Sequence, residues 1–217
     1  MEATYQMSRL RLIFLSVFAV FAVGAIAAAT ASALEFYNIN EELILGLLNI
    51  DSSGGVQILK GELAGTPVQI ECKHVDNRGW VHNGLLNGIL TGLGLLLALY
   101  LECSVAVPAG TNCVVPNIHT LTHFYVVTIS GEDYVEFTPD EGTTFANVVL
   151  EGCNPASLDG SYPVKGVAFA LWENATSELH FKAGAPNNKL KFAGNPAEFE
   201  GKDHILMEGG GNILVKP

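Results

Sequence analysis

Residues 56–72 read VQILKGELAGTPVQIEC, and this stretch indicates the fold most directly. In it, two runs of alternating polar and apolar residues flank the segment Ala64-Gly65-Thr66-Pro67. A period of two places one face of a strand in the core and the other in water. Gly and Pro between two such runs are typical of a hairpin. The stretch therefore predicts two antiparallel strands joined by a short turn.

The same alternation returns in the C-terminal third of the chain, at residues 177–182, 189–192 and 198–200. Turn-forming pairs such as Ala185-Pro186 and Asn195-Pro196 separate these runs. Short strands at regular spacing favour an all-β, mainly antiparallel fold. We expect a β-sandwich or a partly open β-barrel.

The segment between residues 40 and 50 is ambiguous. Its apolar residues fit a short helix capped by Asn40, and they fit a buried strand equally well. The next five residues, Asp51 to Gly55, are typical of a break in regular structure.

Residues 79–101 contain no charged side chain. Three glycines spaced four apart, together with the leucine-rich end, leave room for a transmembrane helix over 85–101. However, Asn83-Gly84 and Asn87-Gly88 are typical hairpin turns, and Asn and Gly are poor helix formers. We expect one or two core strands here, with residues 95–103 buried on both faces.

The N-terminus has the features of a secretory signal peptide. Arg9 and Arg11 precede an uninterrupted apolar run, and Ala31-Ser32-Ala33 fits the small-x-small rule of signal peptidase. We predict a signal-peptide helix over residues 1–33 and a single secreted domain over residues 34–217. An uncleaved membrane anchor is the alternative interpretation.

After such a signal, the four cysteines, Cys72, Cys103, Cys113 and Cys153, predict two disulfides. Three pairings are possible. Cys103 and Cys113 flank a turn around Pro108-Ala109-Gly110, and Cys72 and Cys153 each end an apolar run. We predict Cys103–Cys113 as a local bond and Cys72–Cys153 as a long-range one.

The chain is acidic, with a formal net charge of −11. This charge repels phosphates and anionic lipid heads, so nucleic acid is not an expected partner. We expect contact with a membrane only through an uncleaved signal peptide or the 85–101 segment.

No catalytic or metal-binding motif stands out. His119 and His123 lie four residues apart, but their surroundings favour a strand or loop and no His-Glu-x-x-His run is present. A Gly-x-Ser-x-Gly run is also missing. Glu132, Asp133, Glu136, Asp140 and Glu141 cluster in sequence and leave a carbohydrate hydrolase open as an alternative. We therefore predict no catalytic residue, no metal ligand and no cofactor.

Several short motifs together resemble a known group. They are Ile70-Glu71-Cys72, Leu101-Glu102-Cys103 with Cys113 shortly after, Phe137-Thr138-Pro139 followed by Phe145, and Gly152-Cys153. This combination resembles uncharacterised exported β-rich proteins with four cysteines from soil actinobacteria, over roughly residues 56–215. The resemblance implies a two-disulfide β domain and carries over no catalytic residue. The leucine-rich segment near Leu95 departs from the group, because fewer apolar residues are expected on its outer face.

These observations predict a secreted or cell-wall-associated, non-enzymatic protein with a binding or structural role. Its expected partner is a cell-envelope component or another surface protein. The alternatives are a secreted carbohydrate hydrolase using carboxylates near 132–141 and a membrane-tethered surface protein using 85–101.

Overall fold

The structure, a computed structural model, describes residues 34–184 and 189–217. The described residues pack together as one unit. The predicted signal peptide, residues 1–33, and the predicted turn at Ala185-Pro186 lie outside the described residues. The described part of the chain is all-β with antiparallel pairing, as the alternating runs predicted, and it contains two disulfides, as the four cysteines predicted.

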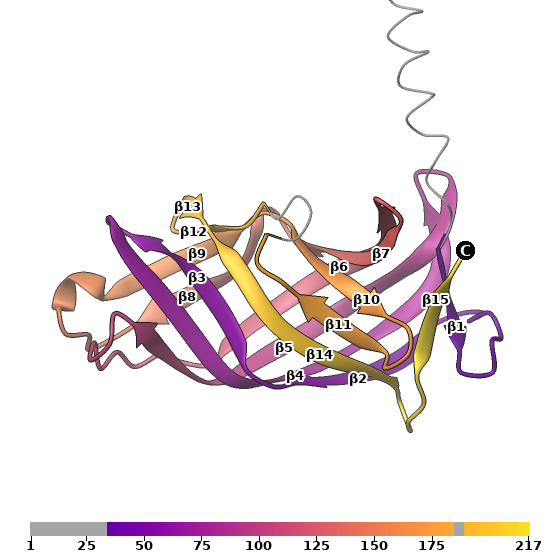
Figure 1. The fold of residues 1–217 in the computed structure, drawn as a ribbon, viewed down its shortest axis with the longest axis horizontal. Helices are drawn as coiled ribbons and strands as arrows, with labels where there is room; N and C mark the ends of the chain where they lie inside the picture. The colour runs from indigo at the N-terminus through magenta and orange to yellow at the C-terminus, as the bar shows by residue number, and fades with distance from the viewer. Residues whose placement is uncertain (1–33, 185–188) are drawn as a thin grey trace, which may run out of the picture. The chain divides into compact units, whose positions relative to one another are not determined.

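The main sheet is built from nine strands. They are β2 (Leu48–Gly54), β3 (Gln57–Leu63), β4 (Thr66–Leu86), β5 (Ile89–Val107), β6 (Ile118–Ile129), β7 (Glu132–Pro139), β10 (Ala168–Glu173), β11 (Glu178–Phe181) and β14 (Glu198–Met207). Neighbours in the sheet are mostly neighbours in sequence, and a pairing between β11 and β14 joins its two sides into a closed ring. Of the two predicted architectures, this pairing supports the barrel (Figure 1).

β2 and β3 occupy the same position in this ring. β2 pairs with the second part of β4 from Val75 onward, β3 pairs with its first part up to Cys72, and both also pair with β14. The predicted break over Asp51 to Gly55 is therefore wrong, because residues 51–54 pair with β4 and the strand is interrupted only at Gly55-Val56. Of the two alternatives for residues 40–50, strand is correct from Leu48 onward, while the residues before it form turns and a bridge between Tyr37 and Leu43.

β4 and β5 form a long hairpin. Its turn is Asn87-Gly88, where both residues have positive φ, at 53° and 83°. A two-residue turn of this kind matches the twist of an antiparallel pair. The uncharged segment 79–101 therefore forms strands, as expected, whereas the other predicted turn, Asn83-Gly84, lies within β4. Among the described residues, no helix is long and apolar enough to cross a membrane.

The two ends of the barrel are covered differently (Figure 1). At one end, β1 (Glu35–Asn38) pairs with β15 (Ile213–Lys216), and Phe36 packs edge-on against Phe124 and Trp172. A second, four-stranded sheet lies at the other end. It comprises β8 (Thr144–Leu150), β9 (Gly160–Lys165), β12 (Lys191–Phe192) and β13 (Asn195–Pro196).

The predicted disulfide pairing is wrong. The structure joins Cys72 to Cys103, and these residues face each other across the β4–β5 hairpin. The register of the hairpin explains the bond, because Cys72 precedes Asn87 by 15 residues and Cys103 follows Gly88 by 15 residues. A two-residue turn in register brings such positions opposite each other.

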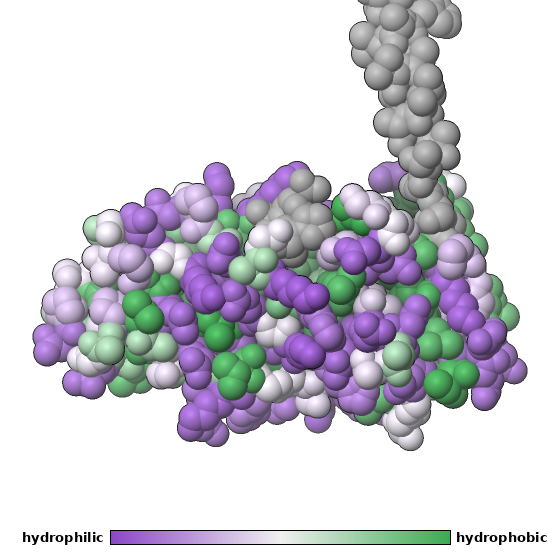
Figure 2. All heavy atoms as spheres, in the orientation of Figure 1, coloured by the Kyte–Doolittle hydropathy of each residue, from purple (hydrophilic) through white to green (hydrophobic). Residues whose placement is uncertain are grey.

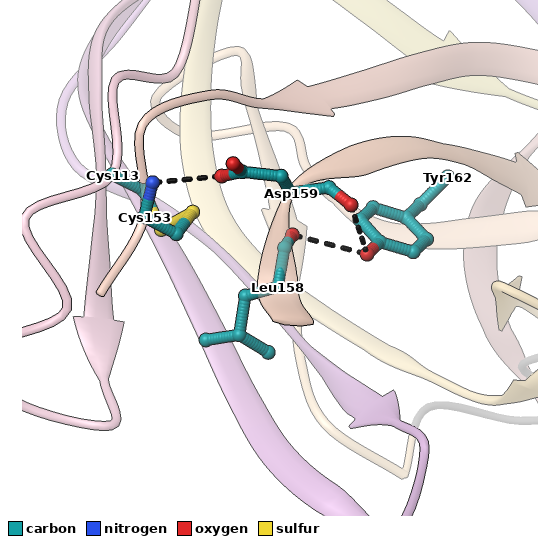
Figure 3. The surroundings of a disulfide bond; sticks show 5 residues. All are labelled: Cys113, Cys153, Leu158, Asp159 and Tyr162. Carbon is teal, nitrogen blue, oxygen red and sulfur yellow. Dashed lines mark hydrogen bonds between the residues drawn. A yellow bond between two sulfur atoms is a disulfide. The ribbon is translucent and has the colours of Figure 1, made fainter. Parts of the chain in front are cut away.

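The second bond joins Cys113 to Cys153. Val114 pairs with Glu151, so the connection between β5 and β6 runs alongside the end of β8 and brings the two cysteines together. Figure 3 shows how the short 3-10 helix η2 (Ala156–Leu158) supports this bond: the Asp159 carboxylate accepts a hydrogen bond from the Cys153 amide, and the Tyr162 hydroxyl donates to the Leu158 carbonyl.

Candidate functional site: a cavity inside the barrel

The main cavity lies within the barrel, partly open to solvent, with a volume of about 100 Å³. Its walls come from inward-facing side chains of the main sheet, such as Leu96, Ala98 and Phe199. The second sheet adds Phe145, Val148 and Val164. Most of the lining is apolar, so an apolar molecule gains free energy when it leaves water and enters the cavity.

One wall carries a polar cluster of Gln57 on β3, Asn77 on β4 and Asp203 on β14. These side chains are only 2 %, 2 % and 5 % exposed. Asp203 Oδ1 accepts a hydrogen bond from Gln57 Nε2 at 2.7 Å, and Oδ2 accepts one from Asn77 Nδ2 at 3.2 Å. The barrel thus brings β14 next to β3 and β4, from which it is far apart in sequence, and places an acid between two amides.

Two glycines make room for this cluster. A Cβ atom at Gly54 would collide with Asp203 Oδ1, and one at Gly201 would collide with Gln57 Oε1. Both positions lie in strands, where glycine is unfavourable unless something approaches the backbone closely. Here the side chains of Asp203 and Gln57 approach the backbone at Gly54 and Gly201.

The cluster is incompletely satisfied by the described residues. Gln57 Oε1 and Asn77 Oδ1 are buried and have no hydrogen-bond partner there. Buried polar atoms are normally paired, so these two enclosed oxygens leave negative potential uncompensated beside the Asp203 carboxylate.

Burial raises the pKa of Asp203 to about 7, although the hydrogen bonds from Asn77 and Gln57 oppose the shift. Burial, and then the nearby Asp203 charge, raises the pKa of Tyr100, which also lines the cavity. Tyr100 therefore stays neutral, while Asp203 changes charge near neutral pH.

The carboxylates considered for hydrolysis lie elsewhere: none of the five between 132 and 141 lines this cavity. The Glu132 carboxylate accepts a hydrogen bond from the Tyr134 hydroxyl, and Asp140 lies 2.7 Å from His123 Nε2. Their partners are thus neighbouring side chains.

His119 and His123 lie on the exposed side of β6. In the part of the chain that the structure describes, no group of three or more His, Cys, Asp or Glu side chains is placed to hold a metal ion.

A second feature lies on the outside of the barrel. Alternate residues of β5 face inward, and those between them form an outward row, which we call the leucine row. The row consists of Leu93, Leu95, Leu97, Leu99 and Leu101. None of these side chains belongs to the buried core, and the neighbouring outward side chains include Trp80 on β4 and Leu121 on β6. The expectation that residues 95–103 are buried on both faces is therefore wrong, since Leu97 is 48 % exposed.

On the face drawn in Figure 2, apolar residues are interspersed among hydrophilic ones. A contiguous apolar row on a protein surface is typical of an interaction site.

Sequence reasoning missed the polar cluster. One signal was present: Gln57, Asn77 and Asp203 each occupy an inward position of an alternating strand, in line with apolar residues such as Leu63, Val75 and Ile205. A polar residue at an apolar position of a strand indicates a buried polar contact.

Comparisons with known proteins assign no family: the chain matches no protein-family model, no curated protein and no solved structure.

Proposed function

We propose that this protein is a binding protein that holds a small, mostly apolar molecule inside the barrel. The observation that carries the proposal is the partly open apolar cavity with a buried polar cluster on one wall. Small-molecule sites commonly combine an apolar lining with a few placed polar groups. Export, which the N-terminus predicts, fits the two disulfides, since such bonds are consistent with an oxidising environment.

The size of the cavity limits the ligand. An engineered apolar cavity of about 150 Å³ in another protein binds benzene. A cavity of about 100 Å³ that is partly open therefore suits a molecule of about the size of benzene, or a longer one whose end protrudes.

Binding is better supported than carbohydrate hydrolysis. Hydrolysis of this class needs two carboxyl groups that flank the scissile bond, at separations of roughly 5–10 Å. Among the residues that line the cavity, Asp203 is the one carboxylic acid.

Benzene is a suitable probe, because it tests the apolar cavity without engaging a head group. We expect saturation-transfer NMR to detect benzene binding to the wild-type protein. Ala98→Phe should weaken binding at least about tenfold, since Ala98 lines the cavity and a ring there fills it. Leu97→Phe is the matched control, because the next side chain along β5 faces outward.

Two results would overturn the proposal: no benzene binding by the wild-type protein, or equal binding by a folded Ala98→Phe variant. Circular dichroism checks that each variant is folded. If Ala98→Phe does not fold, Ala168→Leu changes a second lining position.

The leucine row favours a second candidate function, self-association through the outer face of β5. The row is about 26 Å long at roughly 3.3 Å per residue, comparable with the side of an interface that buries about 800 Å² on each partner. A row of identical side chains is complementary to itself across a two-fold axis. Arg78 and Asp76 lie beside Leu97 and Leu99, so the same axis can set Arg78 against Asp76 of the partner subunit.

Sedimentation velocity tests this second candidate. We expect a dimer for the wild-type protein and a monomer for Leu97→Glu, because a carboxylate in the row would be buried without a partner. Leu85→Glu, at an exposed position near the hairpin turn, should leave the dimer intact. A wild-type protein that is monomeric at all concentrations tested would reject self-association.

A further inference from the structure

We infer that the cavity selects an apolar molecule with a primary amine head, which pairs with the Asp203 carboxylate held between Gln57 and Asn77. This inference rests on the proposed function and adds the chemistry of the ligand.

The polar cluster has no free donor to offer. Gln57 Nε2 donates to Asp203 Oδ1 and to the Lys202 carbonyl, at 2.7 and 3.2 Å. Asn77 Nδ2 donates to Asp203 Oδ2 and to Ser52 Oγ, at 3.2 and 3.0 Å. These contacts also fix the amides, because turning either one over would set its oxygen against the Asp203 carboxylate.

The two amide oxygens, Gln57 Oε1 and Asn77 Oδ1, have no partner among the described residues and are enclosed by protein atoms. They add negative potential to the polar cluster beside the Asp203 carboxylate, which belongs to the cavity lining. This potential favours a head group that brings N–H donors and a positive charge. A carboxylate head would bring further acceptors and a like charge.

The charge of Asp203 favours nitrogen over oxygen in that head. No Lys, Arg or His of the described residues forms an ion pair with this carboxylate. An alkylammonium carries one positive charge and three donors. It can therefore pair with Asp203 through its charge and its N–H groups, whereas an alcohol has one donor and no charge.

Protonation of Asp203 should control this binding. Asp203 on β14 faces Gln57 on β3, Asn77 and Ser52 on β4 and β2, and Tyr100 on β5, of which only Tyr100 titrates, and burial keeps it neutral. Lys202 contributes its backbone carbonyl. Since Asp203 ionises near pH 7, the carboxylate form that pairs with an ammonium gains population between pH 6 and pH 8.

The test compares three probes with one tail: hexylamine, hexan-1-ol and hexanoic acid. By calorimetry at pH 8, hexylamine should bind at least about tenfold more tightly than hexanoic acid, as expected for charge-assisted hydrogen bonds. At pH 6 its affinity should fall about tenfold, because protonated Asp203 no longer pairs with it. Hexan-1-ol should change little.

Two variants complete the experiment. Asp203→Asn should remove the preference for hexylamine and its pH dependence, while Asp51→Asn, an exposed acid on β2, should keep both. Equal or tighter binding of hexanoic acid at pH 8 would overturn the inference, as would an unchanged preference in Asp203→Asn. If Asp203→Asn does not fold, the wild-type series decides. Benzene binding without a preference for the amine would reject this inference alone, whereas loss of benzene binding would reject the proposed function as well.

Discussion

Asp203 is a carboxylic acid held between two amides in the interior of a barrel, with no cation beside it among the described residues. Its surroundings disfavour the charged form, and burial raises its pKa from 3.8 to about 7. The folded protein therefore binds a proton at Asp203 over a pH range in which the unfolded chain has already released it.

This difference predicts how stability depends on pH. With a raised folded pKa, the contribution of Asp203 is fully present below the unfolded pKa, and it is lost as pH rises through about 7. The free energy of unfolding should thus fall by up to about 4 kcal/mol between pH 4 and pH 8 from this group. Urea unfolding of the wild type and Asp203→Asn at several pH values measures it. We expect the free energy of unfolding to decrease less in the variant. Equal pH profiles for the two proteins would contradict the raised pKa of Asp203.

At the scale of elements, the β4–β5 hairpin accounts for the first disulfide and for the leucine row. Its register, set by Asn87-Gly88, places Cys72 opposite Cys103 and turns every second residue of β5 outward. If the register of the hairpin shifted by one residue, the leucine row would face the interior, and Leu96 and Ala98 would face outward.

The disulfides test this register in solution. Peptide mapping without reduction should recover Cys72 linked to Cys103, and Cys113 linked to Cys153. Recovery of Cys72 linked to Cys153 would mean that the hairpin has another register, or that the second sheet packs differently.

The sequence predicts the hairpins well, because alternation and turn residues are local. Val56 to Cys72 forms the expected hairpin, and the runs at 177–182 and 198–200 lie in β11 and β14. The disulfide pairing was also within reach, since Asn87-Gly88 lies midway between Cys72 and Cys103. It was missed because Pro108-Ala109-Gly110 resembles a turn that would join Cys103 to Cys113.

The cavity could not be predicted in the same way. Asp203 is 126 residues from Asn77 and 146 from Gln57, so no local pattern connects them. Only the closure of β11 onto β14, and of β14 onto β2 and β3, brings the three together. Gly54 and Gly201 resemble ordinary strand glycines until the side chains that need their space are known.

On the scale of the whole molecule, the barrel has one end packed with aromatic side chains and a cavity toward the other. Phe36, Phe124 and Trp172 fill the end covered by β1 and β15, while β8 and β9 contribute side chains to the cavity wall. A rigid wall of paired strands holds the polar cluster in place without a ligand, which reduces the free energy needed to organise a site on binding.

The central claim is that the polar cluster inside the barrel binds the head of an apolar amine, and NMR titration with hexylamine at pH 8 tests it most directly. The side-chain NH2 signals of Gln57 and Asn77 should shift in a saturable manner, together with the methyl signals of Leu96 and Val148, which line the cavity. Saturable shifts confined to the leucine row, or no shift of the two amides, would contradict the account.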